Sequence, residues 1–231
     1  TTQKPINDGL ESIAQLSNIQ NPRNGMRAYV KSYHAGQNKG GGTFVYDNSK
    51  ASINDLGTVI NGWVRQNIKT VTVWDFGYKS DDEAKSRAAL IACFTSKYPT
   101  ELLAETLDKH GGLIEVVIDG FNKVIYGKGS KSSILSHVKI VAKNGSFYFK
   151  GFKNNDNGKN YGVIISNYND VFVSDYECEI CYDAVLLWYA NSTESRALVE
   201  NCIARKAYRI GFTADIDSRN VRFVNCKTYD S

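Results

Sequence analysis

The chain has 231 residues, 42% of them hydrophobic, which is enough apolar material to bury one large core or two smaller ones. Its 28 basic and 24 acidic residues give a formal net charge of +4. They are spread without a block of like charge, so nucleic acid and anionic membranes are not indicated as partners. Three prolines, 14 tyrosines and 10 phenylalanines favour a β-rich protein.

The first 66 residues divide into a connector and a small β-module. Residues 1–25 are polar and indicate a leader or connector, whereas residues 26–66 contain alternating aromatic and β-branched residues that predict strands. Three glycines interrupt this pattern, Gly40, Gly41 and Gly42, and they can take positive φ or allow another backbone to come close. A phosphate-binding loop is the alternative, but the glycine and lysine spacing that it needs is absent.

The stretch "VTVWDFGYKSDDEAKSRAALIACF" predicts a strand at 71–75 and then a capping helix at about 81–97. Ser80 and Glu83 have the spacing of a capping box, and the acidic residues between them suit the positive end of a helix dipole. One apolar face of the helix is expected to be buried. It consists of Ala84, Ala88, Ile91 and Ala92.

A strand followed by an Asp or Asn kink and then by an aromatic residue or Cys recurs in the last third of the chain. The copies are 170–178, 196–204 and 220–228. With Asp175, Asn201 and Asn225 as register points, the offsets are 201 − 175 = 26 and 225 − 201 = 24 residues. Such a period is typical of a solenoid, and because the repeats contain no helix, we predict a mostly β fold with a single-stranded right-handed parallel β-helix.

The same alignment predicts which side chains are stacked inside this β-helix. The expected columns are Val171, Ala197 and Val221; Val173, Val199 and Phe223; and Tyr176, Cys202 and Cys226. Residues 136–149 have the pattern of an earlier turn, so the β-helix and its capping helix are expected to occupy residues 67–231. Because the sequence stops inside a repeat, the β-helix is expected to be truncated at its C-terminus.

Five cysteines are predicted to be free and buried, since an odd number in a chain of this size does not indicate a disulfide framework. Cys178 and Cys181, together with Cys202 and Cys226, could be interpreted as a zinc site. The equivalent inward positions of Cys202 and Cys226 explain these residues more simply as stacked apolar thiols. We therefore expect no metal and no cofactor.

The segment from "RAYVKSYHAGQNKGGGTFVYD" through "GTVINGWVR" resembles the N-terminal part of bacteriophage tailspikes that degrade bacterial capsular polysaccharide. The segment "VTVWDFGYKSDDEAKSRAAL" resembles the opening of pectate-lyase-like right-handed β-helices, in which a helix plugs the open end of the coil. The sequence departs from that pattern because no Gly-Asp-Gly follows "DFG" and because it has "NDLG" where a glycine pair is common.

This resemblance implies a homotrimer on the virion tail that acts at the host surface. Its implied activity is polysaccharide depolymerisation, by a glycoside hydrolase rather than a lyase. Its implied partners are bacterial surface polysaccharide and other virion tail or baseplate proteins, with residues 26–66 next to the attachment end. The alternative is a non-catalytic attachment or receptor-binding part of such a spike, whose active site lies in later coils. A third interpretation is a cellular pectate-lyase-like enzyme, but the glycine-rich module does not favour it.

Carboxylates are concentrated near the C-terminus, where residues 167–231 include ten acidic and seven basic residues. Glu177 and Glu179 are the main catalytic candidates, because glycoside hydrolysis usually needs two carboxyl groups. They lie on the outer face of one predicted strand with Cα atoms about 6.7 Å apart, nearer the inverting than the retaining range. The alternative is that they form a solvated exterior face without a catalytic role.

Five further residues complete the predicted site. Asp183 is a catalytic candidate, and Trp188 and Tyr189 could stack on sugar rings in the same surface or lie in a trimer interface. Asp215 and Asp217, in "TADIDS", are second-tier catalytic candidates, although a turn is the alternative role for this segment.

Overall fold

The structure is a computed structural model that describes residues 9–155 and 160–230. The chain divides into two compact units, residues 1–93 and residues 94–231. Residues 1–8 of the predicted leader lie outside the described residues. In the part of the chain that the structure describes, no helix is both long and apolar enough for a membrane crossing.

The first unit contains a four-stranded antiparallel sheet with the strand order β1-β2-β4-β3. Its strands are β1 (Arg27–Ser32), β2 (Gly40–Tyr46), β3 (Val59–Ile60) and β4 (Trp63–Arg65), and its short 3-10 helices are η1 (Ile13–Asn18) and η2 (Asn48–Lys50). The predicted β-module is therefore present. Ile13 and Leu16 are buried in the same core as Val30, Phe44 and Trp63, so this core includes residues that the sequence analysis assigned to the connector.

The glycine triplet at the start of β2 allows backbones to approach each other closely. Gly40 has φ +68°, and a Cβ atom there would lie 2.0 Å from the carbonyl oxygen of Trp74. At Gly41, a Cβ atom would lie 2.3 Å from the carbonyl oxygen of Lys31 on the neighbouring strand. Neither approach is open to a residue with a side chain, so the expectation of close backbone contact is confirmed.

The strand predicted at 71–75 is wrong, because Val73–Phe76 form the 3-10 helix η3. The carboxylate of Asp75 accepts hydrogen bonds from the backbone N–H of Thr72 at 2.8 Å and from its hydroxyl at 3.0 Å. Such local side-chain bonds offer the backbone an alternative to a sheet ladder. Gly77, with φ +86°, ends the turn.

The predicted capping helix is confirmed as α1 (Glu83–Thr95), but its cap and its buried face differ from the prediction. Asp82, rather than Ser80, caps the helix, because its Oδ1 accepts the backbone N–H of Lys85 at 3.0 Å. The buried face consists of Ser86, Ala89, Leu90, Cys93 and Phe94, whereas Ala84 and Ala88 are exposed. Ile91 and Ala92 of the predicted face are half-buried, and the large side chains of Leu90 and Phe94 bury more apolar area than its three alanines could.

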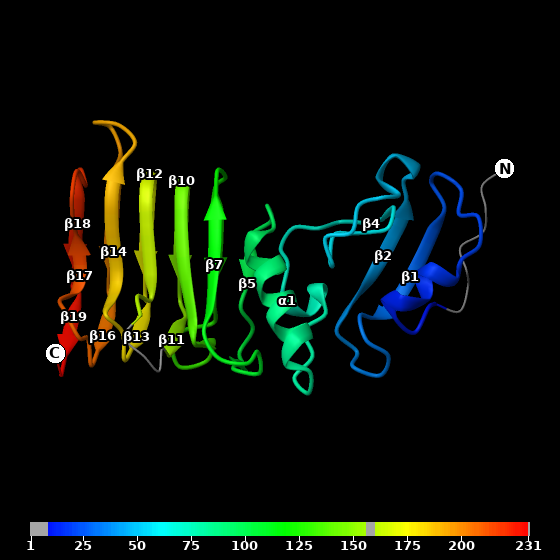
Figure 1. Cartoon of the computed structure of the whole chain (residues 1–231), viewed down its shortest axis with the longest axis horizontal. Helices are drawn as coiled ribbons and strands as arrows, with labels where there is room; N and C mark the ends of the chain where they lie inside the picture. Colours follow the sequence, from blue (N-terminus) through cyan, green and yellow to red (C-terminus); the bar gives the residue numbers. More distant parts are fainter. Residues whose placement is uncertain (1–8, 156–159, 231) are drawn as a thin grey trace. The chain divides into compact units, whose positions relative to one another are not determined.

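The second unit is a parallel β-solenoid made of one nine-stranded and one six-stranded sheet, so the predicted parallel, mostly β architecture is confirmed. Figure 1 shows β7, β10, β12 and β14 lying side by side along it. The strands are β5 (Thr100–Glu101), β6 (Thr106–Leu107), β7 (Ile114–Asp119), β8 (Lys123–Tyr126), β9 (Ile134–Ser136), β10 (Val138–Lys150), β11 (Lys153–Asn155), β12 (Val163–Ser174), β13 (Glu177–Glu179), β14 (Asp183–Ala190), β15 (Arg196–Glu200), β16 (Ile203–Arg205), β17 (Gly211–Ala214), β18 (Val221–Val224) and β19 (Lys227–Tyr229).

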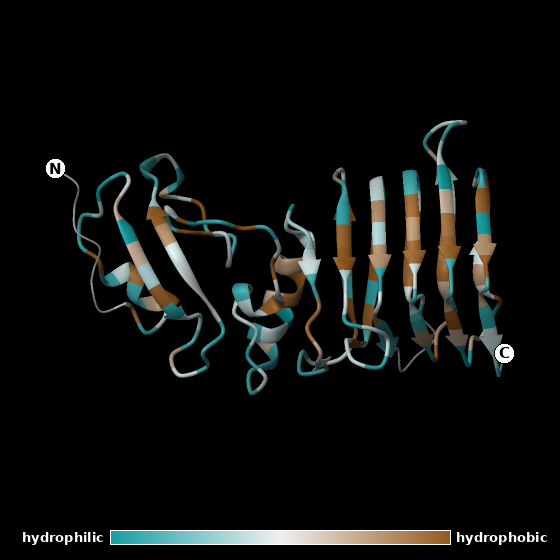
Figure 2. Ribbon diagram, turned by 180° about the vertical axis from the view of Figure 1, so that it is seen from behind, coloured by the Kyte–Doolittle hydropathy of each residue, from teal (hydrophilic) through white to brown (hydrophobic). Residues whose placement is uncertain are grey.

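The predicted register is confirmed. Val173 pairs with Val199, and Val199 pairs with Phe223, all in parallel strands. β10 adds Phe149 below Val173, which confirms the earlier turn at 136–149. In Figure 2 the hydrophobic colouring is concentrated in the middle of the solenoid strands. Buried and exposed residues alternate along β7, as expected for a strand with one face toward a dry interior and the other toward solvent.

The three register points are tight corners of the coil. Asp175, Asn201 and Asn225 all have φ between 50° and 51°, the left-handed region that Asn and Asp tolerate better than other residues with side chains. The Nδ2 of Asn225 donates to the Oδ1 of Asn201 at 2.8 Å. Stacked polar side chains therefore accompany the kink that the sequence pattern predicted.

The five cysteines are not joined in disulfides. Cys93, Cys178, Cys181 and Cys202 are buried, and Cys226 is half-buried. Burial raises the pKa of Cys202 to about 12, which makes this thiol a poor nucleophile. The described residues contain no group of three or more His, Cys, Asp or Glu side chains placed to hold a metal ion.

Candidate functional site

Glu177 and Glu179 lie on β13, in the six-stranded sheet whose strands mostly have three residues. Between them, Cys178 is fully buried in the interior, so both glutamates lie on the outer side of the same strand, as predicted. β11 and β16 flank β13 in parallel register, with Lys153 opposite Glu177 and Arg205 opposite Glu179. The two glutamates therefore lie between a lysine and an arginine from the adjacent coils.

These four side chains form an ion-pair network, which we call the carboxylate ladder. Lys153 Nζ lies 2.6 Å from Glu179 Oε2 and 3.4 Å from Glu177 Oε1, and Arg205 Nε lies 3.0 Å from Glu177 Oε1. All four side chains are at least partly shielded, with exposed fractions between 14% and 39%. The network joins three successive coils and presents oxygen acceptors and nitrogen donors to the solvent.

The electrostatics of the carboxylate ladder favour charged side chains. The hydrogen bond from Lys153 holds the pKa of Glu179 below its usual value, although partial burial opposes this shift. Burial lowers the pKa of Lys153, but the hydrogen bond and charge of Glu179 and the charge of Glu177 outweigh it and raise that pKa. Glu179 is therefore ionised near neutral pH and suits the role of a base or hydroxyl acceptor rather than that of a proton donor.

Replacing Lys153 with Gln is expected to raise the pKa of Glu179, because its main hydrogen-bond donor and a nearby positive charge are lost. Since the folded-state pKa is lowered, the pair stabilises the fold above the ordinary glutamate pKa, and this contribution is lost as the pH falls through the lowered value. Carboxyl ¹³C NMR titration of the Glu179 side chain measures the shift. An unchanged Glu179 pKa in the variant would contradict the network.

Asp183 does not share the outer surface with the two glutamates, so its predicted place beside them is wrong. Its side chain is fully buried at the start of β14. Its Oδ1 accepts the backbone N–H groups of Ile210 and Gly211, each at 3.0 Å, and its Oδ2 lies 3.1 Å from Arg209 Nε. Buried polar groups need such partners, so Asp183 has a structural role and stabilises the turn before β17.

The aromatic candidates are also on β14, and not on β13. Trp188 is half-buried and pairs with Ser166 of β12. Tyr189 is 42% exposed and has φ +48°, so it lies at a corner of the coil. Trp188 and Tyr189 belong to the nine-stranded sheet, whereas the carboxylate ladder belongs to the six-stranded sheet.

Asp215 and Asp217 lie in the loop after β17 and are exposed or half-exposed. Asp215 accepts the backbone N–H of Ile216 at 3.0 Å through its side chain, and its carbonyl accepts the hydroxyl of Ser218 at 2.6 Å. Asp217 has φ +53° and its carbonyl accepts the backbone N–H of Ala190. These contacts form a turn, which was the alternative role for this segment.

Sequence reasoning missed the two cations that pair with the glutamates. The signal was available in the repeat length, because Lys153 precedes Glu177 by 24 residues and Arg205 follows Glu179 by 26. These are the same offsets that relate the register points. A search for opposite charges one period apart would therefore have found the carboxylate ladder.

The N-terminal unit matches a known family of protein domains. Residues 9–68 match the family model described as the phage tail protein small four-stranded beta-sheet domain. The match agrees with the four-stranded β1-β2-β4-β3 sheet. A search of curated proteins finds no match.

The whole chain is similar in fold to solved phage tailspikes. The tailspike protein of Acinetobacter phage vB_ApiP_P1 matches with a TM-score of 0.55 and 20% sequence identity, over 100% of this chain and 40% of that one. The gp42 tailspike of Acinetobacter phage vb_AbaP_AS12 matches with a TM-score of 0.55 and 17% identity, over 99% of this chain and 54% of that one. This chain thus has an N-terminal segment that matches the phage tail β-sheet domain model, followed by a parallel β-solenoid similar in fold to those of tailspikes, and it spans about half or less of these tailspikes.

Proposed function

We propose that the chain is part of a phage tailspike that recognises and degrades bacterial capsular or other surface polysaccharide during host adsorption. The observation that carries this proposal is the order of the two units, in which a phage tail β-sheet domain precedes a parallel solenoid of the tailspike type. The solenoid stacks equivalent side chains in ladders, and a ladder of donors and acceptors on its surface suits a ligand with many hydroxyl groups.

The residues proposed to contact the polysaccharide are those of the carboxylate ladder. Glu177 and Glu179 would accept hydrogen bonds from sugar hydroxyls, and Lys153 and Arg205 would hold both carboxylates in place. If cleavage takes place here, the reaction is hydrolysis in which Glu179, as the base, takes a proton from the attacking water and Glu177 supplies the proton to the leaving oxygen. Asp183, Trp188 and Tyr189 are assigned no catalytic part, because their contacts and sheet separate them from the ladder.

A second candidate function is non-catalytic attachment or receptor binding, with cleavage in another part of the spike. One observation favours it. Both glutamates contact cations, and a proton donor for glycoside hydrolysis needs a raised pKa instead of an ion pair. The share of the matched tailspikes that this chain spans, 40% and 54%, is consistent with this candidate.

The assembly and location are proposed on the same grounds. The chain would form a homotrimer on the virion tail, contact other tail or baseplate proteins through its N-terminal unit, and act at the host surface. Sedimentation equilibrium of the purified chain gives its oligomeric state directly. A mass three times that of the chain is the expected result, and a monomer at all concentrations would contradict self-assembly of this part.

The activity is tested with a panel of purified bacterial capsular polysaccharides by measuring the release of reducing ends. Under the first candidate, the chain releases reducing ends, and Glu177→Gln and Glu179→Gln each lower the rate by about 100-fold or more. Glu115→Gln is the matched control, because Glu115 is an outward carboxylate on β7 that also contacts a lysine, Lys139, at 2.7 Å.

Three outcomes separate the candidates. Cleavage that survives both glutamate substitutions contradicts the site. Binding without cleavage by this chain favours the attachment candidate. A product with new ultraviolet absorbance from a carbon–carbon double bond indicates a lyase and contradicts hydrolysis.

A further inference from the structure

A second ladder of side chains lies on the outside of the solenoid, on β10, β12, β15 and β18 of the nine-stranded sheet. Its members are in register as Tyr148, Phe172, Leu198 and Arg222. They point outward, because their strand neighbours Phe149 and Val173 are fully buried. Tyr148 is 42% exposed, although it has a large apolar ring. The ladder thus places two aromatic rings, an aliphatic side chain and a guanidinium in a row on the surface.

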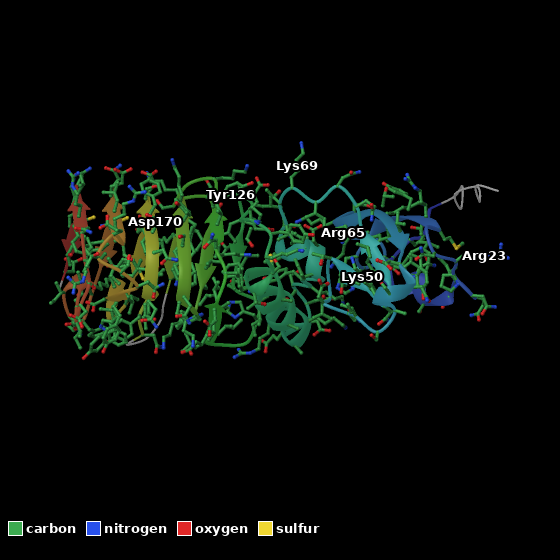
Figure 3. All side chains as sticks on the ribbon, turned by 90° about the horizontal axis from the view of Figure 1, so that it is seen from above. Arg23, Lys50, Arg65, Lys69, Tyr126 and Asp170 are labelled. Atoms are coloured by element: carbon green, nitrogen blue, oxygen red, sulfur yellow. The ribbon has the colours of Figure 1, made fainter. Side chains whose placement is uncertain are left out.

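A polar ladder runs beside it, formed by Asp170, Arg196 and Asn220 in register. Arg196 Nε lies 2.7 Å from Asp170 Oδ1, so this edge is partly fixed by an ion pair. Between the two ladders is a hollow of about 350 Å³, which we call the outer groove. This volume is within the usual range for small-molecule sites. Figure 3, in which Asp170 is labelled, shows the side chains of this part of the solenoid reaching the surface.

The charges of the outer groove favour an anionic group. Its lining includes two arginines and one aspartate, so its formal charge is 2 − 1 = +1. Arg196 is engaged by Asp170, whereas no ion pair or hydrogen bond of the Arg222 side chain occurs among the described residues. Two further acidic residues belong to the same region of the chain: Glu194 lines the adjoining hollow, and Glu200 is in the next outward row of β15. Neither lines the groove itself.

We propose that the outer groove binds an acidic saccharide, with a sugar ring against Tyr148 and Phe172 and the sugar carboxylate on Arg222. Aromatic faces take up the apolar side of a ring, and a guanidinium binds a carboxylate through two parallel hydrogen bonds. The choice of a saccharide rests on the proposed function, whereas the groove and its charge come from the geometry. This site is on a different sheet from the carboxylate ladder and extends the contact with the polysaccharide.

The test is an NMR titration of the full chain with a hyaluronan tetrasaccharide as the acidic probe and maltotetraose as the neutral one. The acidic probe is expected to shift the amide signals of Tyr148, Phe172, Leu198 and Arg222, and to bind at least tenfold more tightly than the neutral one. Tyr148→Ala and Arg222→Gln should each weaken acidic binding about tenfold, which corresponds to about 1.4 kcal/mol. Tyr148→Phe keeps the ring and should bind within about threefold of the original protein.

Tyr29→Ala is the matched control, because Tyr29 is an exposed tyrosine on β1, outside the groove. Spectra that are unchanged away from the substituted residue show that each variant is folded. Acidic binding that is unaffected by Tyr148→Ala and Arg222→Gln overturns the proposal, and so does the absence of groove shifts at saturating probe. Groove shifts that depend on protein concentration without saccharide assign the surface to a second copy of the chain and also overturn it.

The same proteins in the reducing-end assay separate this inference from the proposed function. Acidic binding in the groove without cleavage upholds the groove and counts against the enzyme. Cleavage of a capsular polysaccharide with no groove shifts for either probe upholds the enzyme and overturns the groove.

Discussion

Arg65→Met is expected to lower the opening free energy of the N-terminal sheet by about 3–5 kcal/mol, the range for breaking a buried ion pair. Arg65, labelled in Figure 3, is only 8% exposed at the end of β4. Its Nη1 lies 3.3 Å from Asp75 Oδ1, so removing the guanidinium would leave that carboxylate without its cation. Burial lowers the pKa of Arg65, while the charge of Asp75 opposes this effect.

The guanidinium also satisfies backbone carbonyls that the glycine triplet exposes. Its Nη1 donates to the carbonyl of Gly41, and its Nη2 donates to that of Gly40 at 2.9 Å. Its Nε donates to the carbonyl of Gly57 at 3.1 Å. A buried carbonyl that loses its donor costs about 1–3 kcal/mol. Its Nη2 also donates to the carbonyl of Asp75 at 3.3 Å, so the methionine variant fills the space but leaves four backbone oxygens without these bonds.

Amide hydrogen exchange of peptides covering β1 and β2 measures the effect locally, without requiring the two units to unfold together. The expected loss of 3 kcal/mol or more corresponds to exchange faster by about 100-fold. Arg27→Met is the control, since Arg27 is exposed on β1 and its substitution should leave exchange almost unchanged. Equal protection in the Arg65 and Arg27 variants would show that the carbonyl contacts do not hold the sheet.

Lys123→Met is expected to destabilise the start of the solenoid by about 2–4 kcal/mol, because two or more buried oxygens lose their donor. Lys123 is 1% exposed at the first residue of β8. Its Nζ donates to the carbonyls of Ser96 at 2.8 Å and Tyr98 at 2.7 Å, just beyond the end of α1. A cation at this place also interacts favourably with the C-terminal end of the helix dipole.

The position of Lys123 in the coil explains why a charge is tolerated there. It pairs with Phe147, which pairs with Val171, so the lysine is the first member of an otherwise apolar inward column. The segment after α1 supplies the carbonyls that satisfy this ammonium group. Hydrogen exchange of residues 96–126 measures the loss, with Lys131→Met as the exposed control. An unchanged exchange rate in the Lys123 variant would contradict the buried cap.

Most of the solenoid fold could be predicted from the repeat length in the sequence. Asp175, Asn201 and Asn225 set the period, and the inward columns follow from it because a parallel ladder keeps equivalent residues in line. The glycine triplet likewise indicated close backbone contact before the contacting groups were known. The glycine triplet could not indicate Arg65 as a partner. Arg65 is 25 residues from Gly40, but both residues belong to the antiparallel sheet, to which the repeat of the solenoid does not apply.

The predictions that were wrong concern residues whose structure is set by tertiary or local side-chain contacts rather than by the hydrophobic pattern of the sequence. Val73–Phe76 alternate like a strand, yet the Thr72 and Asp75 contacts make a 3-10 turn. Asp183 looked like a surface carboxylate in sequence, but its backbone donors, Ile210 and Gly211, lie 27 and 28 residues away and are brought near only by the coil. The outer groove was missed because outward apolar residues are ordinary in single strands and become informative only when stacked.

Successive coils stack in parallel register, and this register assembles both the carboxylate ladder and the outer groove. Amide–amide NOEs in a perdeuterated sample test it directly. We predict cross-strand contacts that link the segment around Val173 to that around Val199, and the latter to that around Phe223, with sequence separations rising together along both strands. Contacts in which one residue number rises as the other falls, or no contacts between these segments, would contradict parallel stacking of the coils.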